Sequence, residues 1–154
     1  MTQTQTLIDC LRKEAEAVTA FAQSLADERE AMKRGDFAAL TALVARKTAQ
    51  ADSLARLGAD REARMTARGL RAGPGGQLLG SDIDPAVADA WRKLRFAATA
   101  ARDAIQLNGA IIKAQLEFTR EALQALRSGG ADAGLYGRNG RAETGLRGVS
   151  LASG

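Results

Sequence analysis

Few side chains in this sequence are suited to chemistry. It contains one cysteine, Cys10, and no histidine. Histidine is the commonest general base and the commonest metal ligand, and a single thiolate cannot form a metal cluster. Cys10 lies between Leu7 and Leu11, a setting typical of a small buried residue rather than of a reactive thiol. We therefore expect no catalytic residue, no metal ligand and no cofactor.

Two further patterns resemble catalytic motifs only superficially. Glu14 with Glu16, and Asp27 with Glu28, are paired carboxylates, but nothing in the sequence suggests that they converge in a pocket. Residues 73–76 read Gly-Pro-Gly-Gly, without the Gly-Lys-Ser/Thr ending or the preceding strand of a phosphate-binding loop. The sequence therefore predicts that the protein is not an enzyme and has no small-molecule substrate.

Basic residues are the next candidates, because the chain has a formal net charge of +4. Arg61, Arg64, Arg68 and Arg71 are three or four residues apart, so on a helix they would share one face. No aromatic residues are interleaved for base stacking, and no DNA-binding motif is present. A solvated helix face is the simpler interpretation, and nucleic-acid binding is the weakest of the three hypotheses given below.

Helices are the elements that would position these residues. Hydrophobic residues make up 45% of the chain, largely alanine, whereas aromatic residues make up 4%. Alanine together with Glu, Arg, Leu and Gln favours long, closely packed helices. The predicted fold class is all-α: an elongated antiparallel three-helix bundle, or coiled-coil hairpin, with a long third helix and a flexible C-terminal tail.

Helix boundaries follow from apolar periodicity and from residues that cap helices. Gly35 ends the first pattern and Asp36 is suited to cap the second helix, while Asp84-Pro85 is suited to begin the third. We expect a single helical domain over residues 1–128, followed by a flexible Gly/Arg-rich tail. The expected ranges are helices at about 6–34, 37–70 and 85–127, a flexible linker at 72–83 and the tail at 129–154.

The third helix has a stripe that changes character midway. Its first half is apolar or small, whereas Asn108, Gln115 and Thr119 lie on the same stripe further along. If buried, these polar side chains would need hydrogen-bond partners. They form either a polar layer that fixes helix register, as single Asn residues do in coiled coils, or a partly polar partner surface. Periodicity alone favours neither interpretation.

The second half of this helix also has a surplus of apolar residues. The first two helices can cover only one side of it, yet its apolar residues extend around much of the circumference. Surplus apolar surface on a thin helical protein suggests a binding groove for an amphipathic helix. The residues are Leu107, Ile111, Leu116, Phe118 and Leu123, in addition to Ile112 and Leu126 on the stripe.

Three motifs in residues 108–140 bring a known family to mind. They are Asn-Gly-Ala-Ile-Ile at 108–112, Glu-Ala-Leu-Gln-Ala-Leu at 121–126 and Leu-Tyr-Gly-Arg-Asn-Gly at 135–140. Together they resemble the FlgN-type flagellar export chaperones, which serve type III secretion during assembly of the bacterial flagellum. In one departure, Ile105 stands where that family often has an asparagine.

The resemblance implies a function and partners. Its members bind the C-terminal amphipathic helices of the hook–filament junction proteins FlgK and FlgL, prevent premature assembly and deliver them to the export gate protein FlhA. The family uses the distal third helix for client binding, which on this sequence points to Asn108 and Leu116. Together with the stripe and the apolar surplus, the predicted client-binding residues are Asn108, Gly109, Ile111, Ile112, Gln115, Leu116, Thr119 and Leu123. For docking on the export gate the resemblance implies Tyr136 and Gly137.

Three hypotheses follow for the whole chain. The first is an export chaperone, as the resemblance implies. We expect it in the cytoplasm, since the N-terminus does not read as a secretion signal and no apolar run is long enough to insert into a membrane. The second is a structural coiled-coil protein that uses the same surface to self-associate. The third is a basic helical protein that binds nucleic acid through Arg61, Arg64 and Arg68.

Overall fold

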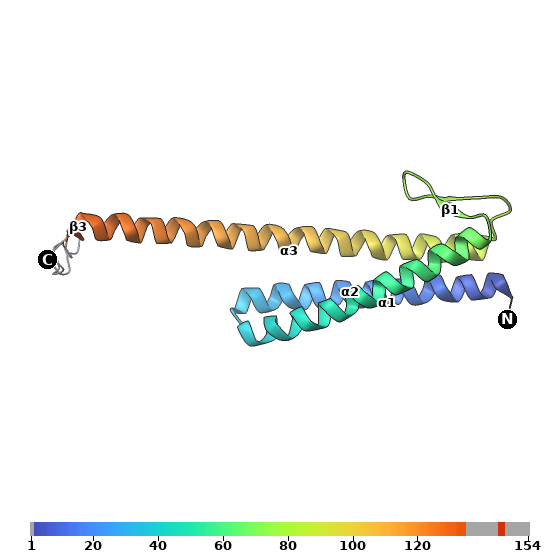
Figure 1. Cartoon of the computed structure of the whole chain (residues 1–154), viewed down its shortest axis with the longest axis horizontal. Coiled ribbons are helices and arrows are strands. Elements are labelled where there is room, and N and C mark those ends of the chain that lie inside the picture. Colours follow the sequence, from blue (N-terminus) through green and yellow to red (C-terminus); the bar gives the residue numbers. More distant parts are fainter. Residues whose placement is uncertain (1, 135–144, 147–154) are drawn as a thin grey trace. The chain divides into compact units, whose positions relative to one another are not determined.

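The chain folds into three helices, as seen in a computed structural model that describes residues 2–134 and 145–146 (Figure 1). A tight turn joins the first two helices, and a longer segment, residues 68–84, joins the second to the third. The all-α prediction is confirmed. Residues 1–108 and 109–154 form two separate compact units, called unit 1 and unit 2 below. The helices are α1 (Gln3–Arg34), α2 (Phe37–Ala67) and α3 (Pro85–Asp132), and the strands are β1 (Arg71–Ala72), β2 (Leu78–Leu79), β3 (Ala133–Gly134) and β4 (Gly145–Leu146).

Local capping sets the start of α1 and its turn into α2. The Thr2 hydroxyl accepts a hydrogen bond from Gln5 N at 3.0 Å, so α1 begins at Gln3 rather than near residue 6, as expected from the sequence. Gly35 takes a left-handed conformation with φ 66°, which suits glycine. The Asp36 carboxylate then accepts from Ala39 N at 3.0 Å. A turn this short makes α1 and α2 an antiparallel hairpin.

The segment after α2 is a β-hairpin where the sequence predicted a flexible linker. α2 ends at Ala67, not at residue 70, because Gly69 has φ 69° and Leu70 N donates back to Met65 O at 2.9 Å. β1 pairs antiparallel with β2. The Trp91 indole Nε1 donates to Gly76 O at 2.9 Å, which ties the hairpin loop to α3.

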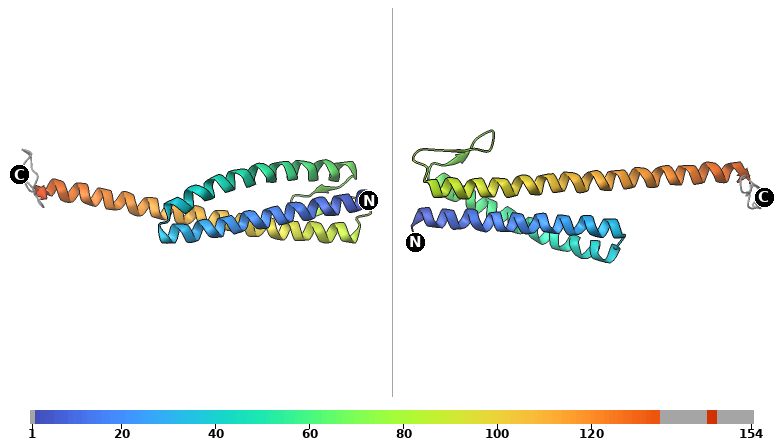
Figure 2. Two further views of the ribbon diagram at one scale, coloured as in Figure 1. Left: turned by 90° about the horizontal axis from the view of Figure 1, so that it is seen from below. Right: turned by 180° about the vertical axis from the view of Figure 1, so that it is seen from behind.

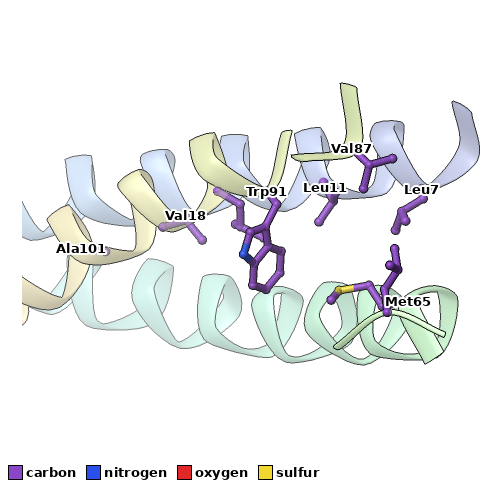
Figure 3. Packing of buried hydrophobic residues seen from close by; sticks show 9 residues of the cluster. Leu7, Leu11, Val18, Met65, Val87, Trp91 and Ala101 are labelled. Carbon is purple, nitrogen blue, oxygen red and sulfur yellow. The ribbon is translucent and has the colours of Figure 1, made fainter. Parts of the chain in front are cut away.

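Unit 1 is held together by a narrow apolar core between its three helices. The first part of α3 lies beside α1 and runs in the same direction, with α2 antiparallel to both (Figure 2). Figure 3 shows Leu7 and Leu11 of α1, Met65 of α2 and Val87 and Trp91 of α3 pointing toward one another. Leu70 of the hairpin segment is 6% exposed and belongs to the same cluster.

Unit 2 begins with the distal part of α3. The helix continues to Asp132, although the sequence predicted a glycine-rich break after residue 127. Each glycine in a helix costs about 1 kcal/mol relative to alanine but keeps its backbone hydrogen bonds, so Gly129 and Gly130 do not end the helix. Beyond it, β3 pairs antiparallel with β4.

Candidate functional site

The distal part of α3 carries a concentration of exposed apolar side chains. The exposed fractions are 42% for Ile112, 60% for Leu116, 72% for Phe118, 59% for Leu123 and 71% for Leu126. A few exposed apolar residues are normal on any protein surface, but five on four turns of one helix are not. We call these five residues the distal apolar face.

The charged residues of the same segment lie on the opposite side of the helix. At about 100° per residue, the charged side chains fall within an arc of about 120°, which leaves the rest of the circumference for apolar, small and uncharged polar residues. The distal part of α3 is therefore amphipathic in its own right. The charged residues are Lys113, Glu117, Arg120, Glu121 and Arg127.

The structure brings most of the predicted client-binding residues onto one stretch of helix. Gln115 and Thr119 are exposed and lie on the same stripe as Ile112, with the exposed Leu116 and Leu123 beside that stripe. Gly109 is exposed and Ile111 is half-buried. The two residues predicted to dock on the export gate, Tyr136 and Gly137, lie outside the described residues.

Asn108 has a different environment from the other predicted residues. Its side chain is 3% exposed, and its Nδ2 donates both to Leu25 O and to Glu28 Oε1 at 2.8 Å. The Asn108 Oδ1 accepts from Arg29 at 2.8 Å. Its amide is therefore fully used inside unit 1, as in a polar layer that fixes register, whereas Gln115 and Thr119 have the exposure expected of a partner surface.

The protein family described as "FlgN protein" matches residues 1–144. The chain belongs to the FlgN family. It is thus a flagellar export chaperone, of a family that consists of chaperones and not of enzymes and that binds flagellar proteins. Neither the curated proteins nor the solved structures contain a significant match to the chain.

This FlgN chain has two buried polar layers that the sequence did not predict. In the first, Arg61 Nε donates to Glu14 Oε2 at 2.7 Å, and its guanidinium lies 5.7 Å from the centre of the Trp91 ring. In the second, Lys47 Nζ donates to Glu28 Oε2 at 2.6 Å, and Glu28 also accepts from Asn108. Each layer takes one residue from α1, one from α2 and one from α3.

The sequence contained a signal for these layers. Glu14 and Glu28 both interrupt the apolar stripe of the first helix and are two heptads apart, and so are Lys47 and Arg61 on the second helix. Equal spacing on two antiparallel helices brings both pairs into one register. Two acidic residues in the apolar stripe of one helix, and two basic residues at the same interval on the next, therefore indicate buried ion pairs.

Two of the four arginines in the predicted basic row pair with carboxylates within the protein. Arg61 pairs with Glu14, and Arg64 donates to Asp60 at 2.9 Å. Arg68, which follows α2, has a buried Nη1 atom without a hydrogen-bond partner among the described residues, and Arg71 in β1 is exposed. These contacts reduce the free basic surface on which the nucleic-acid hypothesis depends.

Asp60 also accepts a hydrogen bond from the Cys10 thiol at 3.3 Å. Burial, together with this hydrogen bond and the Asp60 charge, raises the pKa of Cys10 from its ordinary 9.0 to about 11. The Arg64 guanidinium and the thiol in turn lower the pKa of Asp60. Cys10 is accordingly a protonated, buried thiol at neutral pH.

A metal site and a membrane-spanning helix are two further possibilities for a chain of this kind. Among the side chains that the structure describes, those of residues 2–129, no three of His, Cys, Asp and Glu are grouped closely enough to hold a metal ion. None of the helices in those residues combines the length and the apolarity required to span a bilayer.

Unit 1 also has a groove of about 750 Å³ between α1 and the first part of α3. Small residues such as Ala15, Ala90 and Ala97 line it, and Phe96, which is 80% exposed, lies at the same groove. Phe96 provides an exposed apolar side chain on α3 outside the distal apolar face, and hence a natural control for experiments on that face.

Proposed function

We propose that this chaperone binds the C-terminal amphipathic helices of the hook–filament junction proteins FlgK and FlgL. The distal apolar face supports this proposal, because an amphipathic helix needs an exposed apolar partner of similar length. Gln115 and Thr119, exposed on the same stripe, would keep the free face soluble and donate or accept hydrogen bonds at its edge. Capture in the cytoplasm would prevent premature assembly of the clients before export.

The balance of free energies favours a moderate affinity. Full burial of one Leu or Phe side chain contributes about 1.5–3 kcal/mol. The distal apolar face offers five large apolar residues. Ordering a disordered client segment opposes this gain by about 2–5 kcal/mol or more. A carrier that must release its cargo at the export gate requires such a balance.

The first test is charged substitution on the distal apolar face. Leu116→Asp and Leu123→Asp should each weaken client binding at least about tenfold, because the apolar contact is lost and a carboxylate is desolvated. Isothermal titration calorimetry with peptides from the C-termini of FlgK and FlgL would give the dissociation constants.

Phe96→Asp is the matched control. Phe96 is as exposed as the residues of the distal apolar face but lies on the part of α3 in unit 1, so its substitution should leave the affinity unchanged. Circular dichroism should report equal helicity in all three variants. Wild-type affinity in both Leu variants, or an equal loss in Phe96→Asp, would place the client elsewhere.

Docking on the export gate protein FlhA is a separate step, which we assign to Tyr136 and Gly137. Tyr136→Ala should spare the affinity for client peptides and weaken binding of the loaded chaperone to the cytoplasmic domain of FlhA. Loss of both activities, or of neither, would contradict this division of labour.

Self-association is the main alternative use of the distal apolar face. A second copy of the chain could cover the same five residues, since an exposed apolar surface does not by itself specify its partner. Sedimentation velocity over a range of concentrations separates the two functions. If Leu116→Asp abolishes a concentration-dependent dimer but leaves client affinity intact, the face serves self-association.

A further inference from the structure

Glu28, Lys47 and Asn108 form a hydrogen-bonded polar layer at the end of unit 1. Both oxygens of Glu28 accept hydrogen bonds, one from Lys47 and one from Asn108. Both Nδ2 protons of Asn108 are donated, and its Oδ1 accepts from Arg29. Glu28 is 8% exposed and Asn108 3%. Loss of any one partner would leave a buried charge or amide unpaired, which is strongly unfavourable.

The layer lies on the main seam of α3. Val87, Leu94 and Ala101 are buried at intervals of one heptad, and Asn108 is the next residue in this series. Apolar seam residues pack almost equally well if a helix slides by one heptad, whereas a single buried asparagine selects one register at some expense of stability. Asn108 is therefore the one residue of the series that distinguishes the observed register from its neighbours.

The register determines which residues of α3 belong to unit 1. Unit 1 ends at Asn108. A slide of one heptad would put Gln115 opposite Glu28 and draw Ile111 and Ile112 into unit 1. The Gln115 amide lies one methylene group further from the backbone, so it would not reproduce the two donations that Asn108 Nδ2 makes at 2.8 Å.

We infer that Glu28, Arg29 and Lys47 are positioning residues for client binding, which act by locking Asn108 and thereby keeping the distal apolar face outside unit 1. This inference rests on the proposed client site. It also gives Asn108 a role different from the one that the family resemblance implies. Both of its amide protons are donated inside unit 1 and its side chain is 3% exposed, so substitutions of Asn108 act on binding through the register of α3.

The register can be measured in the full-length free protein. Spin labels at Ala20→Cys and Arg102→Cys, in a Cys10→Ser background, report on α1 and α3 through two exposed positions of unit 1. Electron–electron double resonance should give one narrow distance distribution for the natural layer. In the triple variant Glu28→Leu, Lys47→Met, Asn108→Leu, the distribution should broaden or split, since a one-heptad slide moves α3 by about 10 Å along its axis.

Helicity and Tm of the triple variant separate loss of register from loss of folding. Replacement of a whole buried ionic layer by apolar residues is often neutral or stabilising, so both should stay at or above the wild-type values. Lys47→Arg keeps a positive charge paired with Glu28 and should retain the narrow distance distribution. A single, unchanged distance in the triple variant would overturn the register lock.

Client affinity tests the functional half of the inference. The triple variant should bind the FlgK and FlgL peptides about two- to thirtyfold more weakly, the range typical of residues that act at a distance from a ligand. If Asn108→Ala weakens binding while the triple variant keeps the wild-type distance, Asn108 is a direct contact and the inference fails. If the natural protein binds neither peptide, the proposed client fails, whereas the distance measurement still decides the register lock.

Discussion

Individual residues in this chain show how burial changes the behaviour of a polar group. Glu14 and Glu28 are 7% and 8% exposed, yet each has a basic partner within 2.7 Å. Exposed pairs such as Arg12 with Asp9 have geometry of similar quality but contribute only about 0–1 kcal/mol. The same residue types therefore have a structural role in one place and almost none in another.

Cys10 gives a prediction at this scale. Its pKa of about 11 leaves roughly one thiol in a thousand ionised at pH 8, so alkylation by iodoacetamide should be far slower in the native protein than in urea. Asp60→Asn removes a charge that raises the pKa and should accelerate the native reaction. Equal rates in the native protein and in urea would show that the thiol is exposed.

The same thiol has a consequence for stability at alkaline pH. Because folding raises the pKa of Cys10, the native state favours the neutral thiol. The resulting contribution to the free energy of unfolding is complete below pH 9.0 and disappears as the pH rises toward 11. Relative to Cys10→Ala, the natural protein should therefore lose free energy of unfolding between these values. Urea titrations at intervals across this range provide the measurement.

At the scale of elements, sequence periodicity predicted the three helices because each has a long apolar stripe and a recognisable cap. The β-hairpin at residues 71–79 was missed because its strands have two residues each. Its position depends on a tertiary hydrogen bond from Trp91 to Gly76, which no local pattern reveals.

The candidate site, too, was predicted only in part from the sequence. The distal apolar face is local, so the spacing of Ile112, Leu116 and Leu123 was enough to predict it. The burial of Asn108 depends on Glu28 and Arg29, about 80 residues earlier in the chain. For that reason, periodicity left its two interpretations open, and the structure assigned Asn108 to a polar layer.

The buried pair between α1 and α2 gives a prediction at the scale of elements. Arg61→Met would leave Glu14 charged, buried and without its partner, and should lower the free energy of unfolding by about 3–5 kcal/mol. The double variant Glu14→Leu, Arg61→Met should recover most of this loss. Urea unfolding followed by circular dichroism at the helical minimum measures both.

Arg12→Met provides the control for this pair, since its partner Asp9 lies on the surface. It should change the free energy of unfolding by at most about 1 kcal/mol. If Arg61→Met is as mild as Arg12→Met, the Glu14 carboxylate is not buried as the structure describes.

At the scale of the whole molecule, the apolar core and the proposed client site lie in different parts of the chain. All members of the apolar core cluster lie between Leu7 and Ala101, within unit 1. From Gly109 to Gly129, side chains are exposed or half-buried. At the proposed site, a client would therefore bind and leave without any unfolding of the apolar core.

Truncation tests this separation directly. A chain that ends at Ala114 keeps the core cluster and the full helical turn that follows Asn108, but lacks four of the five residues of the distal apolar face. Because the removed residues contribute no buried side chain within the described range, the truncated protein should unfold cooperatively with a Tm within a few degrees of the full chain. Its binding of FlgK and FlgL peptides should fall below detection. A broad, non-cooperative transition would mean that unit 1 depends on the distal helix for its stability. Retained binding would instead place the client site in unit 1, where the groove beside Phe96 is the first candidate.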